Sequence, residues 1–590
     1  MTADTPAAAL LRVEGLSVDF ASPRGALRVV EDLSFDLHQG ETLCIAGESG
    51  SGKSVTALSL MGLLPKPGGR VAAGQASFDG TDLFSLPERR MAEIRGHEIA
   101  MIFQEPMTSL NPILSIGRQL MEGPMRHLGL SRAVAEKRAV EMLDAVRIAE
   151  PRRRLKQYPH ELSGGMRQRV MIAMAMACHP KILIADEPTT ALDVTVQAQI
   201  LKLMQDLQRE TGTAIILITH DMGVVAETAD RAVIMRRGRA VETGEVSRIF
   251  AHQEHDYTKA LLAAVPKFAN GDRAPEPLPA EAPLLDVRDL VVRFDVRGSG
   301  LIPRVTQRVH AVEKVSFDLK PGETLALVGE SGCGKSTTGK ALLKLVPSQG
   351  AVALKGAALG QSAGEVKAWR RHMQMIFQDP MASLDPRMTV GELVAEPLVI
   401  HGIASGSEIK DRVAKLFERV GLTAEHMTRY PHEFSGGQRQ RICIARALTL
   451  GPKIIVADEC VSALDVSIQA QILELLKELQ DELGVAYLFI SHDMAVVEQV
   501  SHRVAVMYLG QIVEMGPAQA VLGDPRHPYT RKLLTAVPLA DPSRRHLSRE
   551  APEGEVPSPF RPVDFQPSYV TLQDVGGGHL VADASLPQLA

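Results

Sequence analysis

Four short motifs occur twice in this chain in the same order, and this repeat constrains the fold more than any other feature. The first half contains GESGSGKS at 47–54, IFQEPMTSLNP at 102–112, YPHELSGGMRQR at 158–169 and ILIADEPTTALDVT at 182–195. The second half contains GESGCGKS at 329–336, IFQDPMASLDP at 376–386, YPHEFSGGQRQR at 430–441 and IIVADECVSALDVS at 454–467. From Ser163 and Ser435 onward, matched residues stand a constant 272 positions apart. A constant spacing over such a length indicates a duplicated domain rather than chance matches.

The repeat and the composition predict the domain boundaries. We expect one domain at 1–267 and a second at 284–540, each large enough for its own core, since 45% of the residues are apolar and 23% are charged. Between them, residues 268–283 are rich in Pro and Ala and predict a semi-extended linker. Residues 541–590 are again rich in Pro, and we expect a loosely packed C-terminal extension there.

Charge and cysteine content exclude several classes of function. The net charge of -5 lacks the basic excess of nucleic-acid binders, so no nucleic-acid partner is expected. The five cysteines lie far apart without a C-x-x-C pair, which disfavours disulfide frameworks and zinc clusters and fits a reducing cytoplasm. The N-terminal segment does not resemble a signal peptide, and no stretch reaches 18 apolar residues. If the protein works at a membrane, other chains must span it.

Each glycine-rich motif lies between an apolar run, at 42–46 or 324–328, and a predicted helix, which is the context of a phosphate-binding loop. Backbone N–H groups of such a loop converge on phosphate oxygens at a helix N-terminus. The lysine adds a positive charge, and the following serine offers a hydroxyl to Mg²⁺. The predicted nucleotide-binding residues are Gly47, Glu48, Ser49, Gly50, Ser51, Gly52, Lys53 and Ser54, and Gly329, Glu330, Ser331, Gly332, Cys333, Gly334, Lys335 and Ser336.

Two buried strands are predicted to end in an acid pair. In the first half the pair is Asp186 and Glu187, and in the second it is Asp458 and Glu459. The aspartates are suited to the Mg²⁺ shell, together with Ser54 and Ser336, while the glutamates could polarise a water for attack on a γ-phosphate. An exposed acid pair at a strand end is the purely structural alternative.

A serine and two glycines open another predicted helix in each half. These residues are Ser163, Gly164 and Gly165, and Ser435, Gly436 and Gly437. Serine is a good N-cap, so helix capping alone would account for it. The same geometry also offers a second phosphate site without its own lysine, which is useful only across an interface between two domains.

Together these motifs resemble the ATP-binding subunits of ABC transporters, and the resemblance covers nearly all of both halves. It implies two tandem α/β nucleotide-binding domains of the P-loop type, each with a helical signature subdomain, that pair within one chain and enclose two ATP molecules head to tail. Residues from 163–165 would then complete the site of the second domain, and residues 435–437 that of the first. The resemblance further implies that Gln104 and Gln378 sense Mg²⁺ and the γ-phosphate, and that the switch histidines His220 and His492 orient the water and the γ-phosphate. Asp193 and Asp465 match the D-loop position of that family.

Two further passages, HDYTKALLAAVP at 255–266 and HPYTRKLLTAVP at 527–538, are similar to the tail motif of oligopeptide, dipeptide and nickel importers. Within that group the second half is most similar to bacterial glutathione importers. We therefore expect an ATPase that energises peptide import, with glutathione as the preferred substrate and fused di- or oligopeptide import, or nickel import, as the alternative. The implied partners are two integral-membrane permease subunits and a periplasmic solute-binding protein, with this chain peripheral on the cytoplasmic face of the inner membrane.

The rival class comprises soluble ABC ATPases that act on ribosomes or DNA. The short, mildly acidic linker and the lack of zinc-type cysteines or a coiled-coil insertion disfavour it. The chain also departs from its importer group, since no cysteine follows Cys460 and no iron–sulfur cluster is expected. The adenine-stacking residue stays open, because Phe20 and Phe294 could each stack on adenine or belong to the core.

Overall fold

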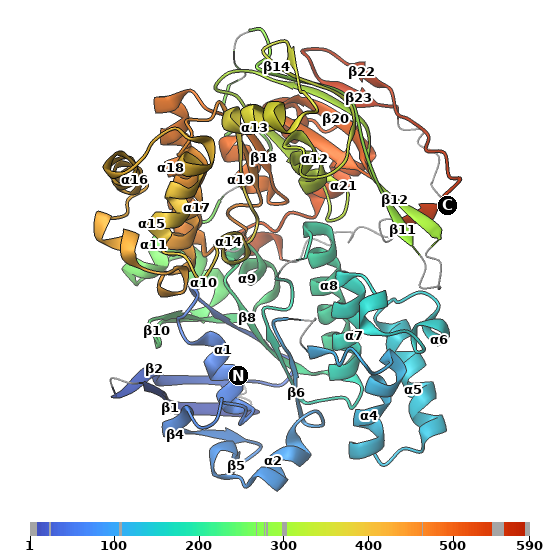
Figure 1. The fold of residues 1–590 in the computed structure, drawn as a ribbon. Helices are drawn as coiled ribbons and strands as arrows, with labels where there is room; N and C mark the ends of the chain where they lie inside the picture. The colour runs from blue at the N-terminus through green and yellow to red at the C-terminus, as the bar shows by residue number, and fades with distance from the viewer. Residues whose placement is uncertain are drawn as a thin grey trace. The chain divides into compact units, whose positions relative to one another are not determined.

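The computed structural model describes residues 9–22, 25–105, 109–190, 192–266, 268–276, 278, 281–297, 304–462, 464–545 and 560–583. The chain forms two compact units. Unit 1 comprises Met1–Leu192, Val196–Val265 and Pro538–Ala551. Unit 2 comprises Asp193–Thr195, Pro266–Val537 and Pro552–Ala590. Figure 1 traces both units along the chain.

The main sheet of unit 1 is mostly parallel and has the strand order β10-β9-β3-β8-β7-β6. Its strands are β3 (Thr42–Ala46), β6 (Ile99–Ile102), β7 (Ile182–Asp186), β8 (Ala214–Thr219), β9 (Arg231–Arg236) and β10 (Arg239–Glu245). Every residue of β3, β7 and β8 is buried, as their continuous apolar sequences predict for parallel strands covered on both faces. Only β10 runs antiparallel to its neighbour. This arrangement brings the carboxyl ends of β3, β7 and β8 to one edge.

A second, antiparallel sheet completes the α/β core of unit 1, in the order β2-β1-β4-β5. Its strands are β1 (Leu11–Ser22), β2 (Gly25–Leu37), β4 (Gly69–Phe78) and β5 (Thr81–Asp82). Apolar side chains of β1 and β2 pack with those of β3 and β7 in one buried cluster. The phosphate loop that follows β3 is therefore held between the two sheets.

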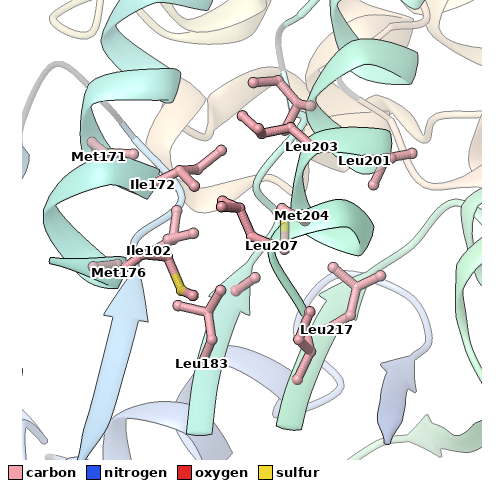
Figure 2. Packing of buried hydrophobic residues seen from close by; sticks show 14 of the residues in the cluster. Ile102, Met171, Ile172, Met176, Leu183, Leu201, Leu203, Met204, Leu207 and Leu217 are labelled. Carbon is pink, nitrogen blue, oxygen red and sulfur yellow. The ribbon is translucent and has the colours of Figure 1, made fainter. Parts of the chain in front are cut away.

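The helices of unit 1 are α1 (Lys53–Leu60), α2 (Glu88–Ile94), α4 (Ile116–His127), α5 (Arg132–Ala145), α6 (Pro151–Arg154), α7 (Gly164–Met176), α8 (Val194–Thr211), α9 (Met222–Thr228), α10 (Val246–Ala251) and α11 (Asp256–Ala264). Helices α4, α5 and α7 contact one another and form the helical subdomain that the sequence predicts. Figure 2 shows apolar side chains of α7 and α8 gathered over β6, β7 and β8. This packing fixes the serine–glycine helix α7 against the sheet whose strand β7 carries Asp186.

Unit 2 repeats this architecture. Its main sheet has the order β16-β17-β18-β13-β19-β20-β23-β22, and its antiparallel sheet the order β15-β14-β11-β12-β21. The strands are β11 (Leu285–Arg297), β12 (Val305–Leu319), β13 (Thr324–Val328), β14 (Gln349–Leu354), β15 (Ala357–Ala358), β16 (Met373–Ile376), β17 (Ile454–Asp458), β18 (Ala486–Ile490), β19 (Arg503–Tyr508), β20 (Gln511–Pro517), β21 (Phe560–Pro562), β22 (Leu572–Asp574) and β23 (Leu580–Ala582). The predicted fold class of two tandem α/β domains with helical subdomains is confirmed.

The helices of unit 2 follow the same order as those of unit 1. They are α12 (Lys335–Leu342), α13 (Ala363–His372), α14 (Pro380–Ser383), α15 (Val390–His401), α16 (Ser407–Arg419), α17 (Gly436–Leu448), α18 (Val466–Leu483), α19 (Met494–Val500), α20 (Ala518–Gly523) and α21 (Pro528–Thr535). Within the residues that the structure describes, no helix of either unit is both long enough and apolar enough to span a bilayer.

Residues 560–583, part of the expected C-terminal extension, add strands to both sheets of unit 2. Strand β21 pairs with the outer edge of β12, and β23 pairs with the outer edge of β20. His579 is buried, with its Nε2 2.7 Å from Oε1 of the buried Glu514. The short apolar groups in this Pro-rich segment are too sparse to predict a strand, but an unpaired sheet edge supplies the backbone partners that they need.

Within the expected linker, the residues around Gly271 are bound to unit 2. Glu498 lies near the end of α19 and is fully buried. Its carboxylate accepts the N–H groups of Ala269 and Gly271 at 2.7 Å each and that of Arg273 at 3.4 Å. Gly271 also lies against the backbone of Gln519. Composition alone could not reveal a buried carboxylate elsewhere in unit 2 that gathers these amides.

Candidate functional site

The phosphate loop of unit 1 joins the buried strand β3 to helix α1. Its first glycine, Gly47, has φ +147°, and a Cβ there would collide with the carbonyl oxygen of Met235. Gly52 caps α1 in the left-handed region. The Lys53 side chain folds back along the loop, so that Nζ donates to the carbonyl oxygens of Gly47 at 2.7 Å and Glu48 at 2.9 Å. The sequence thus builds a tight loop with its lysine at the centre, as predicted.

The loop of unit 2 has the same geometry. Gly329 has φ +147° and Gly334 φ +108°, and Lys335 Nζ donates to the carbonyl oxygens of Gly329 at 2.7 Å and Glu330 at 3.0 Å. Cys333 occupies the position of Ser51, and both are buried. At the tip of each loop, Gly50 and Gly332 face open space, since a Cβ at either would contact nothing within 4 Å. Both loops are therefore open at the tip and closed at the base.

A serine–aspartate pair lies beside each lysine. Ser54 Oγ donates to Asp186 Oδ1 at 2.9 Å, and Ser336 Oγ donates to Asp458 Oδ1 at 2.7 Å. Asp186 is only 4% exposed, and its burial raises its pKa to about 6 against the lowering effect of the Ser54 bond. Burial likewise raises the pKa of Asp458. A hydroxyl and a buried carboxylate form an oxygen donor set that suits Mg²⁺, which would also offset the cost of the buried charge.

Glu187 follows β7, and three side chains contact its carboxylate: the predicted Gln104 and His220, and Thr190. Gln104 Nε2 donates to its Oε2 at 3.0 Å, Thr190 Oγ1 donates to the same oxygen at 2.8 Å, and His220 Nδ1 lies 3.2 Å from its Oε1. Its backbone is in the left-handed region, with φ +46°. Burial raises the pKa of Glu187, but the hydrogen bond and charge of His220, the Thr190 bond and the charge of Lys53 together outweigh it and lower the pKa to about 2. The bond between Glu187 and His220 also raises the pKa of His220 against the effect of its burial.

Glu459 forms the equivalent group in unit 2. Gln378 Nε2 donates to its Oε2 at 2.7 Å, and His492 Nδ1 lies 3.4 Å from its Oε1. Burial raises the pKa of Glu459, but the bond and charge of His492, the charge of Lys335 and the Gln378 bond together outweigh it and lower the pKa. Ser462 stands where unit 1 has Thr190, and its hydroxyl donates to the backbone carbonyl of Glu459 rather than to the carboxylate. The two sites thus share their framework but hold the glutamate differently.

The serine–glycine motifs open α7 and α17. Ser163 Oγ accepts the N–H of Met166 at 3.2 Å, and Ser435 Oγ accepts that of Gln438 at 3.4 Å. Only Gln438 returns a bond, since its Oε1 accepts the N–H of Ser435 at 3.1 Å. The second glycine of each motif packs on the following helix. A Cβ on Gly165 would lie 2.9 Å from a methyl of Val196, and one on Gly437 would lie closer still to a methyl of Ile468. The first glycines, Gly164 and Gly436, have no such contact. Each motif is therefore a capped helix end with an open face.

Two tyrosines contact the phosphate loops, a role that the sequence did not assign to them. The N–H of Glu48 donates to Tyr257 Oη at 3.3 Å, and the N–H of Glu330 donates to Tyr529 Oη at 3.0 Å. Both tyrosines belong to the doubled HDYT and HPYT passages and stand 272 positions apart, which is the signal that could have found them. Of the two candidate adenine-stacking residues, Phe20 packs beside Gly69, and Phe294 is 36% exposed on β11. Both stay predictions.

Comparison with known proteins identifies the family of both units. The family model described as ABC transporter matches residues 30–190 and 312–462, just over half of the chain. The model described as oligopeptide/dipeptide transporter, C-terminal region, matches residues 241–290 and 513–564. The second match covers both loop-contacting tyrosines.

Individual relatives match the chain over almost its whole length. The glutathione import ATP-binding protein of Pectobacterium atrosepticum is 55% identical over 608 residues, which cover 98% of this chain and 97% of that protein. The protein of the same name from Shigella sonnei is 56% identical over 602 residues, covering 97% of this chain and 96% of the relative. Among solved structures, a dimeric bacterial ABC transporter cassette matches with 28% identity and a TM-score of 0.36, over 40% of this chain and 98% of that one.

Proposed function

This chain belongs to the ABC transporter family, and we propose that it is the ATP-binding subunit that energises a glutathione importer. The observation that carries the proposal is the 55–56% identity, over nearly the full length of both chains, to glutathione import ATP-binding proteins. The duplicated constellation of lysine, serine, acid pair, glutamine and histidine supports two ATP-hydrolysing sites. Each unit contributes one complete set of these residues.

ATP binding rests on the two phosphate loops. The open tips at Gly50 and Gly332 leave room for phosphate oxygens near the helix N-termini, where N–H groups and the helix dipole favour an anion. Lys53 and Lys335 each donate to two loop carbonyl oxygens, which holds the positive charge of each ammonium group at the base of its loop. Ser54 with Asp186, and Ser336 with Asp458, would hold Mg²⁺ together with Gln104 and Gln378. When bound, Mg²⁺ would offset phosphate charge.

Hydrolysis requires a water oriented toward the γ-phosphate. With a pKa of about 2, Glu187 is ionised at neutral pH, so its carboxylate can accept a hydrogen bond from that water and orient it. His220 and Gln104 fix the carboxylate by direct hydrogen bonds, and His492 and Gln378 act likewise on Glu459. Phosphoryl transfer gives the protein little covalent chemistry, so positioning and charge are what these residues supply. The missing threonine bond on Glu459 suggests unequal rates at the two sites.

Coupling to transport requires that the two units pair and that membrane subunits contact them. We propose that the open helix ends at Ser163–Gly165 and Ser435–Gly437 each complete the ATP site of the other unit. Unit 2 contains a cavity of about 1090 Å³, lined by Leu345, Phe377 and Ile400 among others. Phe377 directly precedes Gln378 in the sequence. A membrane-subunit segment seated there would respond directly to the glutamine that senses the nucleotide.

The assembly we propose has two integral-membrane permease subunits, a periplasmic solute-binding protein and this chain, which lies peripherally on the cytoplasmic face of the inner membrane. ATP is supplied on that side. The five cysteines are all free and buried, which is compatible with a reducing compartment.

Uptake of labelled glutathione by the host tests the substrate. A strain without this chain should lose uptake, the wild-type chain should restore it, and Glu187→Gln with Glu459→Gln should fail to restore it while still binding ATP. Glu141→Gln, an exposed acid on α5, is the matched control and should restore uptake. Normal ATP hydrolysis by the double variant would show that the assigned glutamates are wrong.

The match to the oligopeptide/dipeptide transporter C-terminal region favours a second candidate, import of di- or oligopeptides. The same strain separates the two. Loss of dipeptide uptake with intact glutathione uptake would replace glutathione with peptides as the substrate, and loss of nickel uptake alone would point to the metal.

A further inference from the structure

The first peptide group of each phosphate loop is held at both ends. In unit 1 the carbonyl oxygen of Gly47 accepts Lys53 Nζ at 2.7 Å, and the N–H of the same peptide group, which belongs to Glu48, donates to Tyr257 Oη at 3.3 Å. In unit 2 the corresponding bonds are 2.7 Å, from Lys335 to Gly329, and 3.0 Å, from Glu330 to Tyr529. The same arrangement therefore occurs twice, in units that fold from separate stretches of chain.

This peptide group needs a restraint because glycine precedes it. Gly47 and Gly329 both have φ +147°, a conformation that other residues rarely adopt and that glycine leaves readily. A rotated peptide would turn the glycine carbonyl oxygen away from the lysine and toward the tyrosine, and the lysine would lose an acceptor that positions it in the loop. The lysine is a poor permanent restraint, since its charge is also required by the phosphate. The tyrosine hydroxyl restrains the opposite end of the same peptide group.

Each tyrosine ring is itself fixed by three devices at equivalent positions. A planar group packs against it. The Arg236 guanidinium lies 4.8 Å from the Tyr257 ring centroid, and the Tyr508 ring, one repeat further on in the chain, lies 4.4 Å from that of Tyr529. The preceding histidine caps the helix, with Nδ1 of His255 accepting the Tyr257 N–H at 3.0 Å.

The third device is a carboxylate on the neighbouring strand. Glu242 accepts the N–H groups of Glu254 at 3.0 Å and His255 at 3.3 Å, and the buried Glu514 accepts those of Arg526 at 2.8 Å and His527 at 3.1 Å. These bonds fix the start of α11 and of α21. In each unit, the strand carboxylate, the histidine cap and the packing of the ring together place the tyrosine hydroxyl beside the amide of the phosphate loop.

We propose that Tyr257 and Tyr529 are positioning residues that hold the phosphate loops in their nucleotide-binding conformation. This inference rests on the proposed ATP binding. It assigns to the two C-terminal regions, residues 241–290 and 513–564, a direct part in the nucleotide sites. Each tyrosine acts only on the loop of its own unit.

The test removes each hydroxyl and reads each site separately. In the full chain, Lys53→Ala silences the first site, so that titration with Mg²⁺ and the slowly hydrolysed analogue ATPγS reports the second. Tyr529→Phe in this background should weaken ATPγS binding about fivefold, as expected for one lost neutral hydrogen bond. Tyr257→Phe in the same background should leave the affinity unchanged. In the Lys335→Ala background, which reports the first site, Tyr257→Phe should weaken ATPγS binding and Tyr529→Phe should leave the affinity unchanged. With both lysines intact, the paired tyrosine variant should show a raised KM for ATP and a kcat within about twofold.

The matched control is Tyr487→Phe, which removes a buried hydroxyl that donates to Leu476 O at 3.1 Å, away from the loop. It should lower Tm without changing ATPγS affinity. Equal affinity for Tyr529→Phe and its parent would overturn the inference, as would an equal loss for Tyr487→Phe. Absence of binding by both parent variants and by the wild-type chain would overturn the proposed function, and this inference with it.

Discussion

Replacing Glu498 with Gln should release the segment around Gly271 from unit 2. In the wild-type chain one carboxylate oxygen accepts Ala269 N–H at 2.7 Å, and the other accepts Gly271 at 2.7 Å and Arg273 at 3.4 Å. A glutamine of the same shape retains one acceptor and presents an N–H group to a second N–H group. One charge-assisted bond is lost, at about 1.5–3 kcal/mol, and the remaining bonds weaken by about 1 kcal/mol. The total is about 3 kcal/mol, or roughly a 150-fold change in the local opening equilibrium.

Hydrogen exchange measured by mass spectrometry is the assay, because local opening need not lower the global Tm. Amides at 269–273 should exchange about 100-fold faster in the variant, while the buried strand β17 keeps its protection. Glu482→Gln is the control: its carboxylate is 57% exposed and pairs with Arg419 at the surface, so its loss should cost less than about 1 kcal/mol. Unchanged exchange at Gly271 in the Glu498 variant would refute the reasoning, since it would mean that the carboxylate does not hold the segment.

Two further predictions concern stability and solubility. Asp36 is partly buried, which raises its pKa, but its 2.9 Å bond to Arg231, the Arg231 charge and the contact with His38 together outweigh burial and lower the pKa below 3.8. A carboxyl whose pKa is lower in the folded state contributes stability at pH values above its unfolded pKa, and this contribution is lost as the pH falls through the folded pKa. Asp36→Asn should therefore lower Tm at pH 7, and the difference in Tm from the wild-type chain should shrink below pH 3.8. A chain that ends at Arg545 should associate in light scattering, because the edges of β12 and β20 lose their partners. A chain that lacks only residues 584–590 is its control, and monodisperse behaviour of the shorter chain would contradict the edge argument.

The sequence was sufficient for the parts of the molecule in which local pattern and chemistry coincide. The apolar runs at 42–46 and 324–328 are β3 and β13, residue for residue, because fully buried parallel strands need continuous apolar sequence. The side chains at Lys53, Ser54, Asp186 and Glu187 meet because strand ends of a parallel sheet share one edge. These features are encoded within a few residues of each motif.

Contacts between distant segments could not be predicted in this way. Glu498 looks like an ordinary acid on an amphipathic helix, and only the fold reveals that it is fully buried among backbone amides. Tyr257 reads as one apolar position of a short helix, although its hydroxyl reaches a loop more than 200 residues earlier. The tail at 560–583 has little propensity for strand, and it forms strands because β12 and β20 present unpaired edges. Such pairings depend on tertiary structure that no local pattern contains.

The strands that close the sheet edges of unit 2 also set an order of events during synthesis. Strand β12 ends at Leu319, and its partner β21 begins at Phe560, about 240 residues later. At roughly 5–20 residues per second, the ribosome needs about 12–50 s to supply that partner. During this interval the nascent chain carries an open edge, and neighbouring chains on the same polysome carry identical ones. Among the tail residues that the structure describes, no strand pairs with β2 at the edge of the first unit's sheet. Translation speed therefore bears on the yield of correctly folded protein mainly through the second unit.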